Sequence, residues 1–248
     1  MKKLLYILTV LIIFACDSED ANDCWQKSGD IINREVETEP FTKILVNENI
    51  EMILKEGPGQ KIVVETGENL LNDIVVEVIE GELILTNNNS CNYVRDYTST
   101  KIYVTAPNIT EIRSSTQFDI SSDGVLTYPD LIIYSEDFRE AYQTTGNFYL
   151  EINNESFRLV FNNLSNCFIS GSTNNLNINF AAGNCRFEGE NLLAGTINVY
   201  HRGSNDIIVH PVESITGNLY GTGDLILVNQ PETVEVEQHY KGKIIYQN

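Results

Sequence analysis

The chain has 248 residues, 42% of them apolar, which is enough to build a sizeable buried core. Its 35 acids outnumber its 16 bases, so the formal net charge is −19 at neutral pH. Because such a field repels phosphate backbones and no run of Lys and Arg offsets it, the composition argues against binding to nucleic acid.

The N-terminus has the pattern of a secretory signal. Two lysines precede an apolar run at residues 4–14, which is too short to span a membrane but long enough for the core of a signal peptide. The run ends in Ala15 and Cys16, and a small residue directly before a cysteine resembles the lipobox of bacterial lipoproteins. We therefore predict a lipoprotein signal peptide over residues 1–15 and a lipid anchor on Cys16. The alternative is an ordinary signal peptide with an incidental cysteine.

Residues 16–23 contain four acids and no base, so they predict a solvated acidic tether between the membrane and the folded domain. The stretch also resembles the export signal that sends Bacteroidota lipoproteins to the outer face of the outer membrane. We therefore predict an outer membrane lipoprotein whose folded domain, residues 24–248, faces the cell exterior. A plain linker that leaves the domain facing the periplasm is the alternative.

Residues 41–106 contain short runs in which apolar and polar side chains alternate, a pattern typical of β-strands. Hairpin signals separate several of these runs, as at residues 56–59 and 80–82. Their spacing differs from that of the later chain. The sequence therefore predicts an N-terminal layer of β-strands that caps or extends the rest of the fold.

From residue 118 onward, apolar-x-apolar pairs recur about every 19 residues, and most follow a turn sequence rich in Gly, Asn and Ser. A unit of this length cannot bury its apolar side alone and must stack on its neighbours. No long stretch shows the apolar spacing of a helix. The sequence therefore predicts an all-β protein, a parallel β-helix (β-solenoid) with coils of about 19 residues. The pairs begin at Phe118, Phe148, Cys167, Cys185, Ile207, Leu225 and Ile244.

One step of the repeat is longer than the others. Phe118 and Phe148 are 30 residues apart, which is one coil plus about ten residues. Residues 127–143 fit the repeat poorly, and we interpret residues 134–142 within them as an insertion. Loops that leave a regular scaffold often carry binding function. A loop that only tolerates extra length is the alternative.

Four cysteines remain beyond the predicted anchor, an even number that suits an oxidising compartment. We predict a disulfide between Cys24 and Cys91, which would pin the start of the domain. Cys167 and Cys185 begin successive apolar pairs, so we expect them to stack on the inward side, either bridged or as small apolar thiols. No histidine shares a spacing with these cysteines, so we predict no metal site.

Charged residues precede the last apolar pairs. Asp206, Asp224 and Lys243 should share one outward column on successive coils, about one strand spacing apart. Two carboxylates so placed could act as a catalytic pair or bind a cation. A charged row of corner residues is the alternative, and we favour it because turn formers fill the rest of the column. These turn formers are Gln117, Asn147, Asn166 and Asn184.

Aromatic and basic residues gather on one turn row, at Tyr200 and His201 and again at Tyr240. Aromatic rings with a polar edge suit stacking on sugar rings. Together with the charged row they form a candidate binding surface for a glycan. Exposed turn side chains without a ligand are the alternative.

Several weak motifs follow one another in order. They are Asp23-Cys24-Trp25, Phe41-x-x-Ile44-x-Val46, Glu68-Asn69-Leu70-Leu71, Glu82-Leu83-x-Leu85, the run at residues 101–107, and Gly223-Asp224-Leu225. With the lipobox, this order resembles the head GIN domain family of adhesin-like proteins, over residues 24–246. The resemblance implies a right-handed β-helix in a head GIN-like domain over residues 24–248, and it brings no catalytic residues.

Two functions from different classes remain. The first is a surface-exposed, lipid-anchored module without catalysis or cofactor, which binds a glycan or an extracellular host protein or has a structural role. The second is a β-helical, glycan-active enzyme similar to a polysaccharide lyase or hydrolase, with carboxylates on one exposed face. We favour the module, because most outward turn positions hold Asn, Gly and Ser. The sequence gives no indication of an oligomeric state.

Overall fold

The computed structural model describes residues 24–89, 91–93, 100–136 and 144–247. The predicted signal peptide at 1–15, the lipidation site Cys16 and the tether at 16–23 lie outside the described residues. Those three predictions therefore stay predictions.

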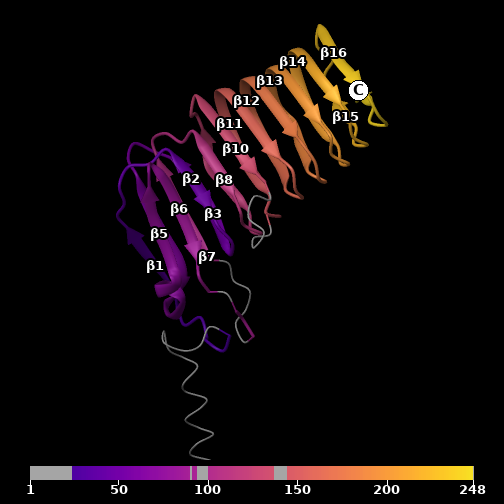
Figure 1. Cartoon of the computed structure of the whole chain (residues 1–248). Coiled ribbons are helices and arrows are strands. Elements are labelled where there is room, and N and C mark those ends of the chain that lie inside the picture. Colours follow the sequence, from indigo (N-terminus) through magenta and orange to yellow (C-terminus); the bar gives the residue numbers. More distant parts are fainter. Residues whose placement is uncertain (1–23, 90, 94–99, 137–143, 248) are drawn as a thin grey trace, which may run out of the picture.

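Strands make up most of the described chain, which confirms the prediction of an all-β protein (Figure 1). A short 3-10 helix, η1 (Glu68–Asp73), lies between two of them. The strands are β1 (Ile31–Val36), β2 (Lys43–Val46), β3 (Ile50–Glu56), β4 (Lys61–Gly67), β5 (Ile74–Ile79), β6 (Glu82–Asn87), β7 (Thr100–Ala106), β8 (Glu111–Ser114), β9 (Ile120–Leu126), β10 (Asp130–Ser135), β11 (Phe148–Phe161), β12 (Asn166–Phe180), β13 (Arg186–His201), β14 (Ile207–Leu219), β15 (Leu225–Leu227), β16 (Thr233–Gln238) and β17 (Ile244–Tyr246).

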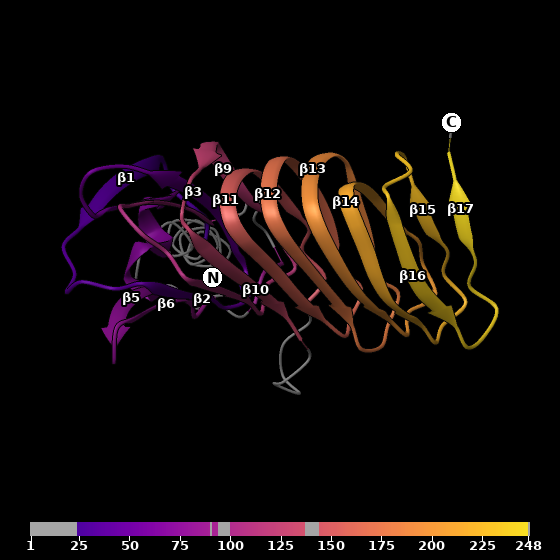
Figure 2. The same ribbon diagram turned by 90° about the horizontal axis from the view of Figure 1, so that it is seen from above.

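The long C-terminal strands stack in parallel, each on equivalent residues of the one before (Figure 2). Phe148 of β11 pairs with Cys167 of β12, and Cys167 pairs with Phe187 of β13. These steps of 19 and 20 residues advance the chain by one strand spacing. The repeat in the sequence therefore corresponds to the stacking of successive parallel strands. We call each such step of the chain a coil.

The N-terminal strands belong to the same large sheet, which is mixed and nearly closed. β2 pairs in parallel with β6 and β8, and β3 pairs in parallel with β7 and β9. Antiparallel pairings join β1 to β4, β4 to β7 and β5 to β6. The N-terminal layer thus both extends the coils and adds antiparallel strands to them, and β1 and β17 lie at opposite ends of an elongated body in both views (Figures 1 and 2).

The segment 127–143 is more regular than predicted, and the insertion predicted at residues 134–142 is wrong for its first two residues. Residues 130–135 form β10, whose Leu131 pairs with Phe157 of β11. They are therefore a regular half of a coil. The spacing of apolar pairs missed this strand because it counts only one of the two strands in each coil. Residues 137–143 lie outside the described residues.

Inward side chains form a continuous core that includes a file of aromatic rings. Phe161 stacks on Phe180 with ring centroids 5.6 Å apart, and Phe180 meets the ring of His201 edge-on at 6.1 Å. All three side chains are fully buried. The file follows from strand alternation, because residues two apart along a strand point to the same side.

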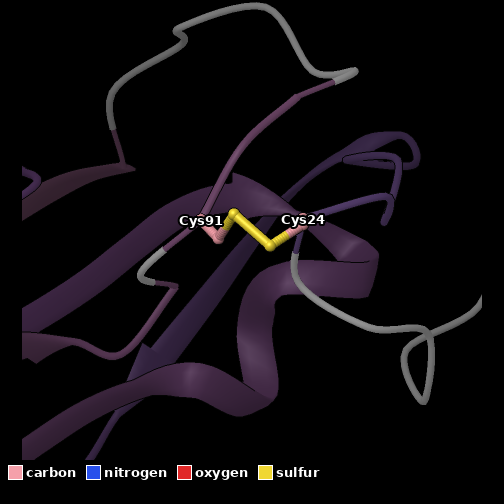
Figure 3. Close-up of a disulfide and its surroundings, with 2 residues drawn as sticks. All are labelled: Cys24 and Cys91. Carbon is pink, nitrogen blue, oxygen red and sulfur yellow. A yellow bond between two sulfur atoms is a disulfide. The ribbon is translucent and has the colours of Figure 1, made fainter.

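The predicted disulfide between Cys24 and Cys91 is confirmed (Figure 3). The backbone N–H of Tyr93 also donates to the carbonyl of Cys24 at 2.9 Å, and the rings of Trp25 and Tyr93 meet edge-on at 5.6 Å. These contacts hold the start of the domain against the segment that follows β6.

Cys167 and Cys185 are both buried free thiols, but their predicted equivalence is wrong. The register aligns Cys167 with Phe187, so Cys185 lies two residues earlier in its own coil. Its Sγ is 3.1 Å from the carbonyl oxygen of Asn163. Spacing alone failed here because Cys185 is a buried corner residue that comes before its strand begins at Arg186.

Candidate functional site

The predicted charged row is a row of corner residues joined by hydrogen bonds. Asp206 Oδ1 accepts the backbone N–H of Asp224 at 2.9 Å, and Asp224 Oδ1 accepts that of Lys243 at 2.8 Å. Each carboxylate thus satisfies a backbone donor on the next coil, which favours the interpretation as corner residues over a catalytic pair.

The register also corrects the membership of this row. Asp119 rather than Gln117, and Arg186 rather than Asn184, stand in the column. Asp119 accepts the N–H of Asn147 at 3.0 Å, and Arg186 Nη1 donates to Asp206 Oδ2 at 3.2 Å. The corner row therefore consists of Asp119, Asn147, Asn166, Arg186, Asp206, Asp224 and Lys243.

The prediction that His201 lies on a binding surface is wrong. Its side chain is fully buried in the aromatic file, and its Nδ1 accepts the N–H of Gly203 at 3.3 Å. Burial lowers the pKa of His201, while the carbonyl of Asn205 and nearby carboxylates act in the opposite direction. His201 therefore contributes to the core and does not face a ligand.

The two tyrosines predicted beside it point outward but are not stacked on each other in the structure. Tyr200 packs on Tyr220 with centroids 5.4 Å apart, and Tyr220 stacks on His239 at 4.3 Å. Tyr240 is 60% exposed. Tyr220 was not predicted, although it follows Tyr200 by about one repeat, whereas His239 stands directly before Tyr240 in the predicted turn row.

A second outward column was also missed, and it is unusually apolar for a position on the outer side of the sheet. Its residues alternate with the buried residues of the same strands, except that Ile208 is itself buried. Seven of its nine members are apolar, and the exceptions are serine and glutamate. We name it the outer column, and in register order it consists of Tyr103, Ile53, Ser121, Tyr149, Phe168, Glu188, Ile208, Ile226 and Ile245.

An aromatic pair stands at the middle of the outer column. The rings of Tyr149 and Phe168 stack with centroids 4.8 Å apart and planes within 4°. Tyr149 is 41% exposed and Phe168 is 37% exposed. Exposed rings that stack with parallel planes on a sheet face are typical of recognition surfaces rather than of cores.

A bulge in β13 lies beside this pair. Phe168 pairs with Glu188 and Gly171 with Leu192, so three residues of β13 oppose two of β12. Glycine is needed at position 189, because a Cβ there would lie 2.3 Å from Cε1 of Phe187. The next coil holds the bulge, since a ring nitrogen of His210 lies 3.1 Å from the carbonyl oxygen of Glu190.

An open surface pocket of about 370 Å³ lies between Phe168 and the bulge. Glu188 also forms an ion pair with Arg186, whereas Glu190 is exposed and has no ion pair among the residues that the structure describes. The pocket thus combines a ring, two carboxylates, an amide and a hydroxyl. Its lining residues are Phe168, Ile169, Ser170, Glu188, Glu190 and Asn191.

The fold and the outer column define an elongated all-β protein with an exposed aromatic face. The chain belongs to the family described as "putative auto-transporter adhesin, head GIN domain", whose model matches residues 40–231. This confirms the family expected from the order of the motifs. No match is found among the curated proteins.

Solved structures share the fold. A putative adhesin from Bacteroides fragilis has a TM-score of 0.78 at 18% identity, and the alignment covers 89% of this chain and 99% of that one. A putative adhesin from Parabacteroides merdae has a TM-score of 0.63 at 14% identity, covering 90% and 98%. A putative lipid binding protein from Parabacteroides distasonis has a TM-score of 0.59 at 17% identity, covering 89% and 98%.

No helix within the described ranges has the length and hydropathy to cross a membrane.

Proposed function

We propose that this protein is a non-catalytic binding module on the cell surface, anchored by a lipid on Cys16 and raised from the membrane by the acidic tether. Its domain over residues 24–248 is a right-handed parallel β-helix whose outer column forms the binding face. Support for the helix is the parallel register, with steps of about 19 residues. Support for surface display is the adhesin-like family and the pattern of residues 1–23.

The exposed Tyr149 and Phe168 pair, with the pocket beside it, is the observation on which the proposal rests. Two stacked rings that are each more than one third exposed leave apolar area that a ligand can cover. The outer column runs along the long axis of the molecule, across successive strands. A linear glycan laid along this axis could place apolar ring faces on the column and hydroxyl groups against the neighbouring polar side chains.

Absence of catalysis is part of the proposal. The carboxylates of Asp206 and Asp224 each accept a backbone N–H of the next coil, so they are occupied as structural acceptors. A glycan-active enzyme needs two carboxyl groups free to exchange protons or attack the sugar. Of the two carboxylates at the pocket beside Phe168, Glu188 forms an ion pair with Arg186, so the pocket does not offer two free carboxyl groups to a β-helical lyase or hydrolase.

A glycan and matrix-protein array tests the proposal. We expect the purified domain to bind one or more linear glycans, and we expect a Tyr149→Ala, Phe168→Ala double variant to lose that binding. The matched control is Tyr240→Ala, which removes an exposed ring at the other candidate surface. Binding only to matrix proteins would replace the glycan with an extracellular protein ligand. Equal loss in the Tyr240 variant would overturn the assignment of the binding face.

A further inference from the structure

We infer that the pocket beside Phe168 binds a free ammonium group, carried by a non-acetylated amino sugar of the glycan. This inference rests on the proposed function and names the chemistry that the binding face prefers.

The aromatic wall of the pocket is placed for a cation. Phe168 stands between Tyr149 and Glu188 in the outer column. Tyr149 covers one face of its ring at 4.8 Å, which leaves the face on the Glu188 side to border the pocket. The face of an aromatic ring carries negative charge density and attracts an ammonium group within about 6 Å of its centre.

The charge around the pocket is not balanced by the protein. Arg186 contacts both Glu188 and Asp206, the latter at 3.2 Å. Glu190 has no ion pair among the residues that the structure describes. The pocket therefore keeps one carboxylate whose charge the protein does not pair, which a cationic ligand would offset and an acidic glycan would oppose.

The backbone places Glu190 beside the ring. The bulge brings Glu190 out of the regular register, and the His210 ring nitrogen holds its carbonyl at 3.1 Å. Asn191 and Ser170 supply an amide and a hydroxyl at the same pocket. A bulge that re-aims a side chain toward a pocket is a recurrent feature of binding sites.

The pocket volume fits a sugar-sized group. About 370 Å³ lies at the lower end of the range for small-molecule sites. A single amino sugar can therefore enter while the rest of the chain follows the outer column. The amine would lie between the Phe168 ring and the Glu190 carboxylate.

Three oligosaccharides with the same linkage and length test this inference: one of glucosamine, one of N-acetylglucosamine and one of glucose. Their dissociation constants are measured by calorimetry at low salt and at pH 6, where the free amine is charged. We expect the glucosamine oligomer to bind about tenfold more tightly than the two uncharged ones. We expect Glu190→Gln to bring the three affinities close together.

The control is Glu235→Gln, which removes one exposed carboxylate on β16, in another column of the sheet. If this variant lost the preference as fully as Glu190→Gln, the preference would come from the overall charge and the inference would fail. If the uncharged oligomers bound as tightly as the charged one, the inference would fail while the proposed glycan binding stood. If none of the three bound, the inference would fail. The glycan and matrix-protein array would then test the proposed function separately.

Discussion

The side-chain carboxylate of Asp206 accepts the backbone N–H of Asp224 at 2.9 Å, across one step of the coil stack. The same carboxylate group takes a second hydrogen bond from Arg186 at 3.2 Å. Asp206, which the sequence offered as a candidate catalytic residue, therefore joins three successive coils. Its main role is to satisfy donors at a corner where strand pairing ends.

Asp206→Ala should lower the free energy of unfolding by about 1–3 kcal/mol, because it leaves the Asp224 N–H without its acceptor and removes one of the acceptors of the Arg186 guanidinium. Asp206→Asn keeps one side-chain oxygen and should cost less than half as much. Urea denaturation monitored by circular dichroism measures both. Equal losses in the two variants would show that the charge, and not the acceptor, matters at this corner.

The disulfide between Cys24 and Cys91 closes a loop with a sequence separation of 67. Constraining a loop of this length in the unfolded chain is worth about 4 kcal/mol in the chain-entropy model. We therefore expect reducing agent to lower the melting temperature of the wild type. A Cys24→Ser, Cys91→Ser variant should melt at that lower temperature with or without reductant. A further shift of this variant by reductant would point to a second bridge.

The sequence predicted the all-β class well because burial imposes a strict alternation on each strand. It placed the stacking repeat, the Cys24 and Cys91 bridge and the charged corner residues. His201 was misplaced, yet the alternation of Ile197, Val199 and His201 already puts it on the buried side.

The errors in register have a physical cause. Coils differ in length by one or more residues, and the difference lies at corners and at the bulge of β13. Apolar residues occupy both corners and strands, so Cys185 was taken for the first residue of an inward pair. Only the hydrogen-bond register distinguishes these positions.

The outer column was missed for a related reason. Ile226 and Ile245 each stand between two apolar or aromatic neighbours, so the sequence suggests that they belong to fully buried runs, as Ile208 does. Such three-residue runs in a strand with only one buried face are the signal that could have found the column.

The buried His201 predicts a dependence of stability on pH. Burial lowers its pKa from the ordinary value of 6.5, so the unfolded chain takes up a proton at a higher pH than the folded one. The free energy of unfolding should therefore fall as the pH drops below about 6.5, and this contribution should level off below the folded pKa. His201→Phe should remove this contribution, because a phenyl ring continues the aromatic file without titrating.

The free energy of unfolding of the wild type and of His201→Phe is measured from about pH 8 to about pH 5, a range that covers the titration of the histidine. Carboxylates contribute to both proteins, so the difference between the two curves isolates His201. The control is His239→Phe, a change at a partly exposed ring. Parallel curves for wild type and His201→Phe would contradict the prediction.

The proposed lipid anchor predicts where the protein fractionates. Each buried methylene of an acyl chain contributes about 0.8 kcal/mol, so several chains on Cys16 hold a protein firmly in a membrane. Detergent phase partitioning should recover the wild type with the detergent, and Cys16→Ser should move to the aqueous phase. Protease added to intact cells should degrade the wild type if it faces outward. Detergent partitioning of the serine variant would contradict the anchor.

Gly189 links the stability of the fold to the shape of the proposed site. A Cβ at this position would lie 2.3 Å from Cε1 of Phe187 and 3.2 Å from the carbonyl oxygen of Ile208. Phe187 is fully buried, so its ring has little room to move. Gly189→Ala should therefore lower the free energy of unfolding by about 1–3 kcal/mol and weaken ligand binding at the neighbouring pocket. Gly59→Ala is the matched control, because nothing lies within 4 Å of a Cβ there, and it should change stability by less than about 0.5 kcal/mol. If urea denaturation gave both variants the same stability, the bulge would accommodate a side chain, and the pocket would not depend on the glycine.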